Sequence, residues 1–187
     1  FLVLWVTFVY APIAHWVWAG DGWLFELGTL DFAGGTVVHI NAGVAAVAAA
    51  WLVGKRRGVD RGVEPHNVPF VILGASILWF GWFGFNAGSG LASDGLAISA
   101  FLVTNTAAAM ALVVWVILGH IHTGKMSAVG AATGAVAGLV ALTPASGFAG
   151  PMGAIAIGLG AGVLTFYAVR IRHKFGFDDA LEVMAVH

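Results

Sequence analysis

The chain has 187 residues, of which 60% are hydrophobic and only 9% are charged, with a mean hydropathy of +0.94. Because soluble domains carry about a quarter of their residues as charges, this composition excludes a soluble globular protein, and its many apolar residues exclude disorder. The net charge of -1 gives no basic surface for nucleic acid, and the absence of cysteine excludes disulfides and thiolate metal sites within this sequence.

Long apolar runs dominate the chain, bounded by clusters of charge, glycine and proline. A helix that crosses a hydrocarbon core about 30 Å thick needs roughly 20 mostly apolar residues, and the runs lack the sustained alternation of a membrane barrel. We therefore predict an all-α, polytopic transmembrane helix bundle, with residues 1–187 forming part of a single transmembrane domain. The predicted spans are 1–18, 31–53, 68–87, 96–118, 127–142 and 151–169, followed by the start of a seventh near residue 182.

The basic residues are segregated along the chain. All eight follow the second, fourth or sixth predicted span, whereas the intervening loops contain no Lys or Arg. Because cytoplasmic loops carry the excess of Lys and Arg, we predict a multi-pass protein of the plasma or inner membrane with loops 54–67, 119–126 and 170–181 in the cytoplasm. The basic residues are Lys55, Arg56, Arg57, Arg61, Lys125, Arg170, Arg172 and Lys174.

Small residues recur every four positions on the last two complete spans. At this spacing they let helix backbones approach closely, which replaces the hydrophobic drive that is absent from lipid. We predict tight helix contacts at these positions, either within the bundle or between chains. One row consists of Gly130, Gly134 and Gly138, and the other of Gly150, Ala154, Gly158 and Gly162.

Two histidines fall where an ionisable side chain costs at least about 2.5 kcal/mol at the bilayer centre. His39 lies eight residues after Asp31 and hence about 12 Å deeper along a helix, and His187 lies in a segment that enters from the cytoplasmic side. Each is either satisfied by a neighbouring carbonyl or hydroxyl, or is one of two imidazoles that line a narrow polar path. Neutral imidazole keeps one donor and one acceptor, which suits a small hydrogen-bonding solute or a proton relay.

Asp31 and the aromatic residues also have two interpretations each. At the start of a helix, Asp31 either caps backbone amides and complements the helix dipole or stabilises a nearby cation. Aromatic residues at the outer ends of the first and third spans form either an interfacial belt or faces over which a cation is held. Histidines and carboxylates at the spacing of a metal site are absent from the sequence. We therefore predict neither a metal nor a cofactor.

Three motifs of the chain are long and distinctive. They are LDFAGGTVVHINAG at residues 30–43, GWFGFNAGS at residues 81–89, and the closing stretch DDALEVMAVH. Together they resemble the ammonium transporter family, the Amt branch of the Amt/Rh superfamily. The resemblance covers the whole chain as the family's fourth to tenth spans, and it implies an internal fragment of a longer subunit.

The resemblance implies an outer site that recruits ammonium. Trp18 matches the family's vestibule tryptophan, Ser89 its vestibule serine, and Asp31 the aspartate that orders and electrostatically supports this site. The family moves ammonium or methylammonium inward, assembles as a homotrimer with one pore in each subunit, and often docks a PII-type signalling protein on its cytoplasmic face. The expected activity is therefore transport and not an enzymatic reaction.

The resemblance also implies a gated pore below the recruitment site. Phe85 matches a phenylalanine that closes the pore, with Trp82 beside it, and His39 and His187 match the twin histidines that line the pore. A bare ammonium ion in such an apolar passage would lose its hydration without replacement ligands. The hypothesis is that ammonia passes after deprotonation, with or without proton transfer along the histidines. The alternative is an ammonium sensor that couples the same fold to a cytoplasmic signalling domain.

Overall fold

The structure is a computed structural model that describes residues 1–59, 64–175 and 178–187. Regular structure within these residues is helical, and six of their helices are long and apolar enough to cross a membrane. The predicted all-α, polytopic bundle is confirmed. Arg61 lies outside the described residues, as does the side chain of Lys174.

The helices follow the apolar runs closely, with differences at several ends. The first span is one continuous helix in which a π-helical turn separates two α-helical parts. The elements are α1 (Leu2–Trp5), η1 (Val6–Tyr10), α2 (Ala11–Trp18), α3 (Trp23–Glu26), η2 (Gly35–Ile40), α4 (Asn41–Val53), α5 (Val68–Gly88), α6 (Gly95–Thr123), α7 (Ala128–Leu142), η4 (Thr143–Ala145), α8 (Pro151–Phe175) and α9 (Val183–Val186).

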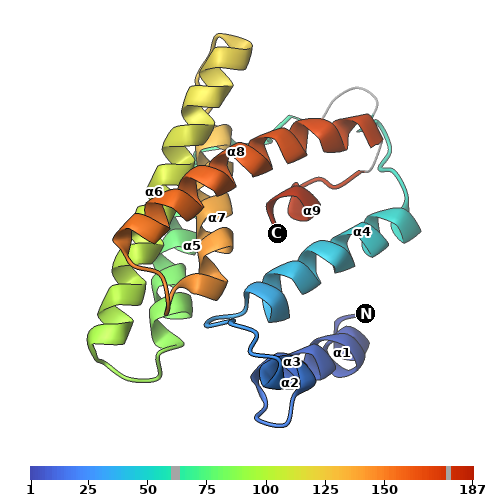
Figure 1. Ribbon diagram of the computed structural model, residues 1–187. Coiled ribbons are helices and arrows are strands. Elements are labelled where there is room, and N and C mark those ends of the chain that lie inside the picture. The colour runs from blue at the N-terminus through green and yellow to red at the C-terminus, as the bar shows by residue number, and fades with distance from the viewer. Residues whose placement is uncertain (60–63, 176–177) are drawn as a thin grey trace.

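Helices α5, α6, α7 and α8 form one bundle, in which α6 contacts each of the other three (Figure 1). Buried aliphatic residues from α6, α7 and α8 meet in its interior, including Val103, Leu142 and Ala154. Helix α4 lies to one side of the bundle, and the short helix α9 contacts both α4 and α8 between them. The end of the chain is thereby placed against the helix that carries His39.

The predicted rows of small residues lie mostly at helix crossings within the chain. A Cβ added to Gly138 would lie 2.4 Å from the carbonyl oxygen of Ala107 on α6, so only glycine fits there. Gly150 has no atom within 4 Å of such a Cβ, so the predicted contact is wrong at that position. The other glycines at which a Cβ would approach α6 within 3 Å are Gly134, Gly158 and Gly162.

Replacing Gly158 by alanine should destabilise the bundle. The new Cβ would lie 2.5 Å from the carbonyl oxygen of Ala107, and such overpacking costs about 1–3 kcal/mol. The matched control is Gly160→Ala on the same helix, where a Cβ meets nothing within 4 Å and the better helix propensity of alanine is retained. Thermal unfolding of the full-length protein in detergent should show a lower Tm for the first variant only. Equal Tm values would contradict this packing.

Two helices continue past the ends of their predicted spans. Helix α6 runs to Thr123 and α8 to Phe175, so parts of the predicted loops 119–126 and 170–181 are helical. At the end of α6, His122 Nδ1 and the Thr123 hydroxyl lie 2.8 Å from carbonyl oxygens one turn earlier, and Gly124 with φ 72° follows the last turn. Apolar length marks the thickness of the membrane, whereas polar residues of this kind continue a helix beyond it.

The second span begins at Gly35, later than predicted, and it begins with the π-helical turn η2. The amide of His39 donates to the carbonyl oxygen of Gly34, five residues earlier, at 3.1 Å, which is the π-helical pattern. Gly34 has φ 110°, a left-handed conformation that glycine adopts without strain. Asp31 therefore precedes the helix, and His39 lies on a wide turn just before α4.

Candidate functional site

The carboxylate of Asp31 accepts hydrogen bonds from four consecutive backbone N–H groups. Asp31 is buried, at 7% exposure, and both of its oxygens are used. The first residues of a helix have no intrahelical acceptor for their amides, so this one side chain satisfies the start of the second span. The donors are Gly34 at 2.7 Å, Gly35 at 2.6 Å, Thr36 at 2.8 Å and Val37 at 3.2 Å.

Trp18 is fixed against the same turn. Its indole N–H donates to the backbone carbonyl of Asp31 at 2.8 Å, and a Cβ on Gly34 would lie 3.6 Å from its ring. Trp18 remains 42% exposed. At the end of α5, the hydroxyl of Ser89 donates to the carbonyl oxygen of Phe85 at 2.9 Å. Within the described residues, no hydrogen bond or ring contact joins Trp18 to Ser89.

The two predicted pore histidines lie together although they are 148 residues apart. Their Nδ1 atoms are separated by 3.1 Å and their ring centroids by 5.1 Å. One of the two nitrogens must carry the proton and the other must accept it, so the pair shares a single hydrogen bond at a time. Gly43 makes room for the chain end, because a Cβ there would lie 3.1 Å from the carbonyl carbon of His187.

Aromatic rings cover His39. Trp82 stacks on His39 with ring centroids 5.2 Å apart and an interplanar angle of 16°, and Phe85 lies 5.8 Å away. The Trp82 indole N–H donates to the hydroxyl of Thr143 at 2.9 Å, which fixes the ring in place. His39, Trp82 and Phe85 line a cavity of about 360 Å³ together with four aliphatic or glycine residues.

One ring nitrogen of His39 has no partner in the part of the chain that the structure describes. His39 is 4% exposed, and this nitrogen without a hydrogen-bond partner is its Nε2. A buried polar atom of this kind is costly unless a partner is provided. Within the described residues, His39 Nε2 is therefore a polar atom without a partner beside a cavity whose other lining residues, apart from Trp82, have apolar side chains or none.

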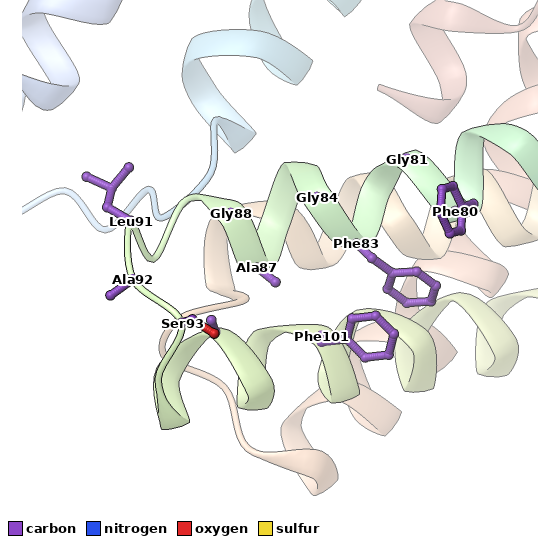
Figure 2. Close-up of a pocket in the computed structure, with 11 residues that line it drawn as sticks. Phe80, Gly81, Phe83, Gly84, Ala87, Gly88, Leu91, Ala92, Ser93 and Phe101 are labelled. Carbon is purple, nitrogen blue, oxygen red and sulfur yellow. The ribbon is translucent and has the colours of Figure 1, made fainter.

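A larger cavity of about 850 Å³ lies elsewhere, between α5 and the start of α6 (Figure 2). Phe83 and Phe101 stack beside each other in its wall, with ring centroids 3.9 Å apart. Glycines and small apolar residues form most of the remaining lining, and none of its lining residues is titratable. Its chemistry does not match that of a site for a polar solute, so the cavity beside His39 is the stronger candidate.

The whole chain, residues 1–187, matches the model of the family described as the Ammonium Transporter Family. The chain belongs to the ammonium transporter family. This is a family of transporters and not of enzymes, and the chain is accordingly a multi-pass membrane protein.

Relatives within the ammonium transporter family are similar over nearly the whole chain. The ammonium transporter Amt1 of Archaeoglobus fulgidus is 54% identical over 98% of this chain and 47% of its own length. The crystal structure of Saccharomyces cerevisiae Mep2 matches with a TM-score of 0.93 and 40% identity, over 100% of this chain and 43% of Mep2. A structure named Sensor Amt Protein matches with a TM-score of 0.88 and 40% identity, over 98% of this chain and 48% of that protein. The chain thus spans about half the length of these relatives.

Some residues of the site were missed by sequence reasoning. Thr143, which holds Trp82, lies in the 3₁₀ turn after α7, and its hydroxyl gave no sign of a partner 61 residues away. Asn86 is fully buried beside Phe85 and donates to the hydroxyl of Thr104 at 3.0 Å. An amide and a hydroxyl inside predicted spans were the available signals, because polar side chains there need partners.

Proposed function

We propose that the full-length protein transports ammonium across the plasma or inner membrane. The observation that carries this proposal is the histidine pair, with Nδ1 atoms 3.1 Å apart, in which His39 lines a cavity walled by aromatic and aliphatic side chains and His187 lines a second cavity of about 310 Å³. Such walls disfavour an ion because they offer too few oxygen ligands to replace its hydration. A neutral ammonia molecule loses less on entering and finds hydrogen-bonding nitrogens on its way.

The proposed path begins at an outer site. Ammonium is recruited at Trp18 and Ser89, with its charge supported by Asp31, and is then deprotonated. Ammonia passes Phe85 and Trp82 and exchanges hydrogen bonds with His39 and His187. Potassium is rejected because it has no proton to lose. The proton either returns outside or crosses the histidine pair, and membrane current during uptake distinguishes these two routes.

We also propose the assembly and orientation of the full-length protein. It forms a homotrimer with one pore in each subunit, and loops 54–67, 119–126 and 170–181 lie on the cytoplasmic side. The segregation of Lys and Arg into these loops supports that orientation. A PII-type signalling protein is the proposed partner on this face.

A sensor is the competing function, because the structure named Sensor Amt Protein is also similar to this chain. The curated relatives at 50% identity or more over the whole chain are named ammonium transporters, and this favours transport. The sequence that follows His187 discriminates between the two, since a sensor requires a signalling domain there.

Uptake by liposomes that contain the purified full-length protein tests the proposed function. Labelled methylammonium should enter, excess ammonium should block its entry, and excess potassium should leave it unchanged. Protein-free liposomes provide the background. Entry at the background rate, or equal competition by potassium, would refute selective ammonium transport.

Replacing Trp18 by leucine should weaken recruitment. A cation held over an aromatic face gains about 0.5–2 kcal/mol, so the apparent KM for methylammonium should rise about 2- to 30-fold. Trp16→Leu is the matched control, because Trp16 lies in the same helix and is 41% exposed, against 42% for Trp18. Concentration-dependent uptake gives both KM values. An unchanged KM in the Trp18 variant would show that Trp18 does not recruit the substrate.

A further inference from the structure

Residues 178–187, here called the His187 segment, are attached to the helix of His39 at both ends. At one end, the ring of His187 contacts His39 and its backbone lies against Gly43. At the other end, Asp178 binds Arg56, which follows the end of α4. The segment therefore runs alongside α4, and its helix α9 lies between α4 and α8 (Figure 1).

The contact between Arg56 and Asp178 uses three donors of one residue. The guanidinium donates through Nη2 to Oδ1 at 2.6 Å and through Nε to Oδ2 at 2.8 Å, and the Arg56 backbone N–H donates to Oδ2 at 2.7 Å. The Asp178 side chain is only 3% exposed. Such a two-pronged pair fixes the orientation of both groups as well as their distance.

The pair stays ionised over the whole physiological pH range. Hydrogen bonds from the side chain and backbone of Arg56 lower the pKa of Asp178 from 3.8 to about 2. A carboxylate with a depressed pKa keeps its stabilising contact above the unfolded value, and loses it only as the pH falls toward the folded value. The attachment of the His187 segment therefore does not vary between pH 5 and pH 8.

The interior of the His187 segment is also held by its own side chains. The carboxylate of Asp179 accepts the backbone N–H of Met184 at 2.7 Å, at the start of the turn that leads to His187. Glu182 pairs with Arg172 of α8. These contacts hold the backbone between Asp178 and His187 in one arrangement, so the place of Asp178 helps to set the place of His187.

The His187 segment is folded between its two attachments. Residues 180 and 181 form a turn, the backbone N–H of Glu182 donates to the carbonyl oxygen of Asp179 at 3.3 Å, and Glu182 has φ 56° just before α9. The segment would lengthen if this turn opened, so the contacts that keep it folded, with the anchor of Asp178 at Arg56, hold His187 at its present depth.

We propose that Arg56 is a positioning residue, which holds Asp178 so that His187 stays at the level of His39. This inference rests on the proposed transport function, because it assigns Arg56 a role in conduction through the histidine pair. Arg56 lies outside the cavity and does not touch the histidines. Its effect is therefore expected on the rate of passage and not on recruitment at the outer site.

The test compares Arg56→Gln with Arg57→Gln in the full-length protein. Both remove one positive charge from the same exposed turn, but Asp178 bonds to Arg56. Because misplacement of an active group by about an ångström costs up to about a hundredfold in rate, Arg56→Gln should lower the maximal rate of methylammonium uptake about tenfold or more and leave KM unchanged. Arg57→Gln should match the wild type, and Arg56→Lys should recover part of the rate.

A distance measurement tests the attachment independently of transport. Spin labels at Leu52 in α4 and Leu181 in the His187 segment, both highly exposed, should give a narrow distance distribution that broadens in Arg56→Gln but not in Arg57→Gln. Unchanged distances, or broadened distances with an unchanged maximal rate, would overturn the positioning role. Absence of uptake by the wild type would instead refute the proposed function, while the distances would still report on the attachment. If Arg56→Gln does not fold, Arg56→Lys with its weaker pairing is measured in the same way.

Discussion

Full-length protein that carries His39→Ala should lose ammonium-selective uptake, with methylammonium entry falling on the order of tenfold to a hundredfold. The reason is that ammonia would meet an apolar wall where it now meets imidazole, and a buried polar group left without a partner costs about 1–3 kcal/mol. Trp82 and Phe85 would remain as walls, while His187 would lose the partner that lies 3.1 Å from its Nδ1. Uptake into liposomes, with competing ammonium and potassium, measures the effect.

The control for this result is His122→Ala, because His122 is exposed at the end of α6, far along the chain from the histidine pair. Its uptake and selectivity should equal those of the wild type. Unchanged, ammonium-selective uptake by the His39 variant would reject the relay and the pore role of this residue together. Current recorded in the wild type during uptake would further assign the proton to the histidine pair.

Asp31→Ala should strongly destabilise the full-length protein. Four backbone amides would lose their acceptor in a buried turn, and each unsatisfied buried donor costs about 1–3 kcal/mol. Asp94→Ala is the matched control, because Asp94 also caps a helix, through Leu96 and Ala97, but is exposed. An exposed cap is worth about 0.5–2 kcal/mol. Thermal unfolding in detergent should therefore show a much larger loss for the Asp31 variant.

The milder variant Asp31→Asn separates the two interpretations of this residue. An amide oxygen still accepts hydrogen bonds but carries no charge, so the cap is weakened while the support of a cation is removed. Loss of methylammonium affinity with little loss of Tm would favour the role in recruitment. A fall in Tm that parallels the fall in uptake would favour the helix-capping role alone.

The sequence was sufficient for the helices, because hydropathy over about 20 residues reports directly on the membrane. It was less informative on helix ends, which depend on local hydrogen bonds such as that of Thr123 in α6. The predicted span began at Asp31, whereas the helix begins at Gly35, because Asp31 accepts amides at the turn around Gly34, which hydropathy does not report.

Contacts between distant residues were harder to predict. The positions of His39 and His187 in the predicted spans placed them at intermediate depth, whereas the indole of Trp82 and the hydroxyl of Thr143 carried no pattern that linked them. The hydrogen bonds between Arg56 and Asp178 were not predicted either, because the sequence showed only that each residue lies in a polar loop. Such pairs depend on how the helices pack against one another. A periodic pattern within one segment of the sequence does not report this packing.

The π-helical turn at Gly35–Ile40 has a consequence for insertion and deletion along the chain. A π-helical turn holds one residue more than the α-helical turn it replaces, so deleting one of its residues would leave a continuous α-helix in which the flanking residues keep nearly their present orientation. The same deletion in α4 would instead rotate all side chains on one side of it by about 100° relative to the other. His39 and Arg56, which both hold the His187 segment, would then be rotated relative to each other. The span should therefore tolerate the loss of a codon within Gly35–Ile40 better than the loss of one within α4, provided that His39 itself is retained.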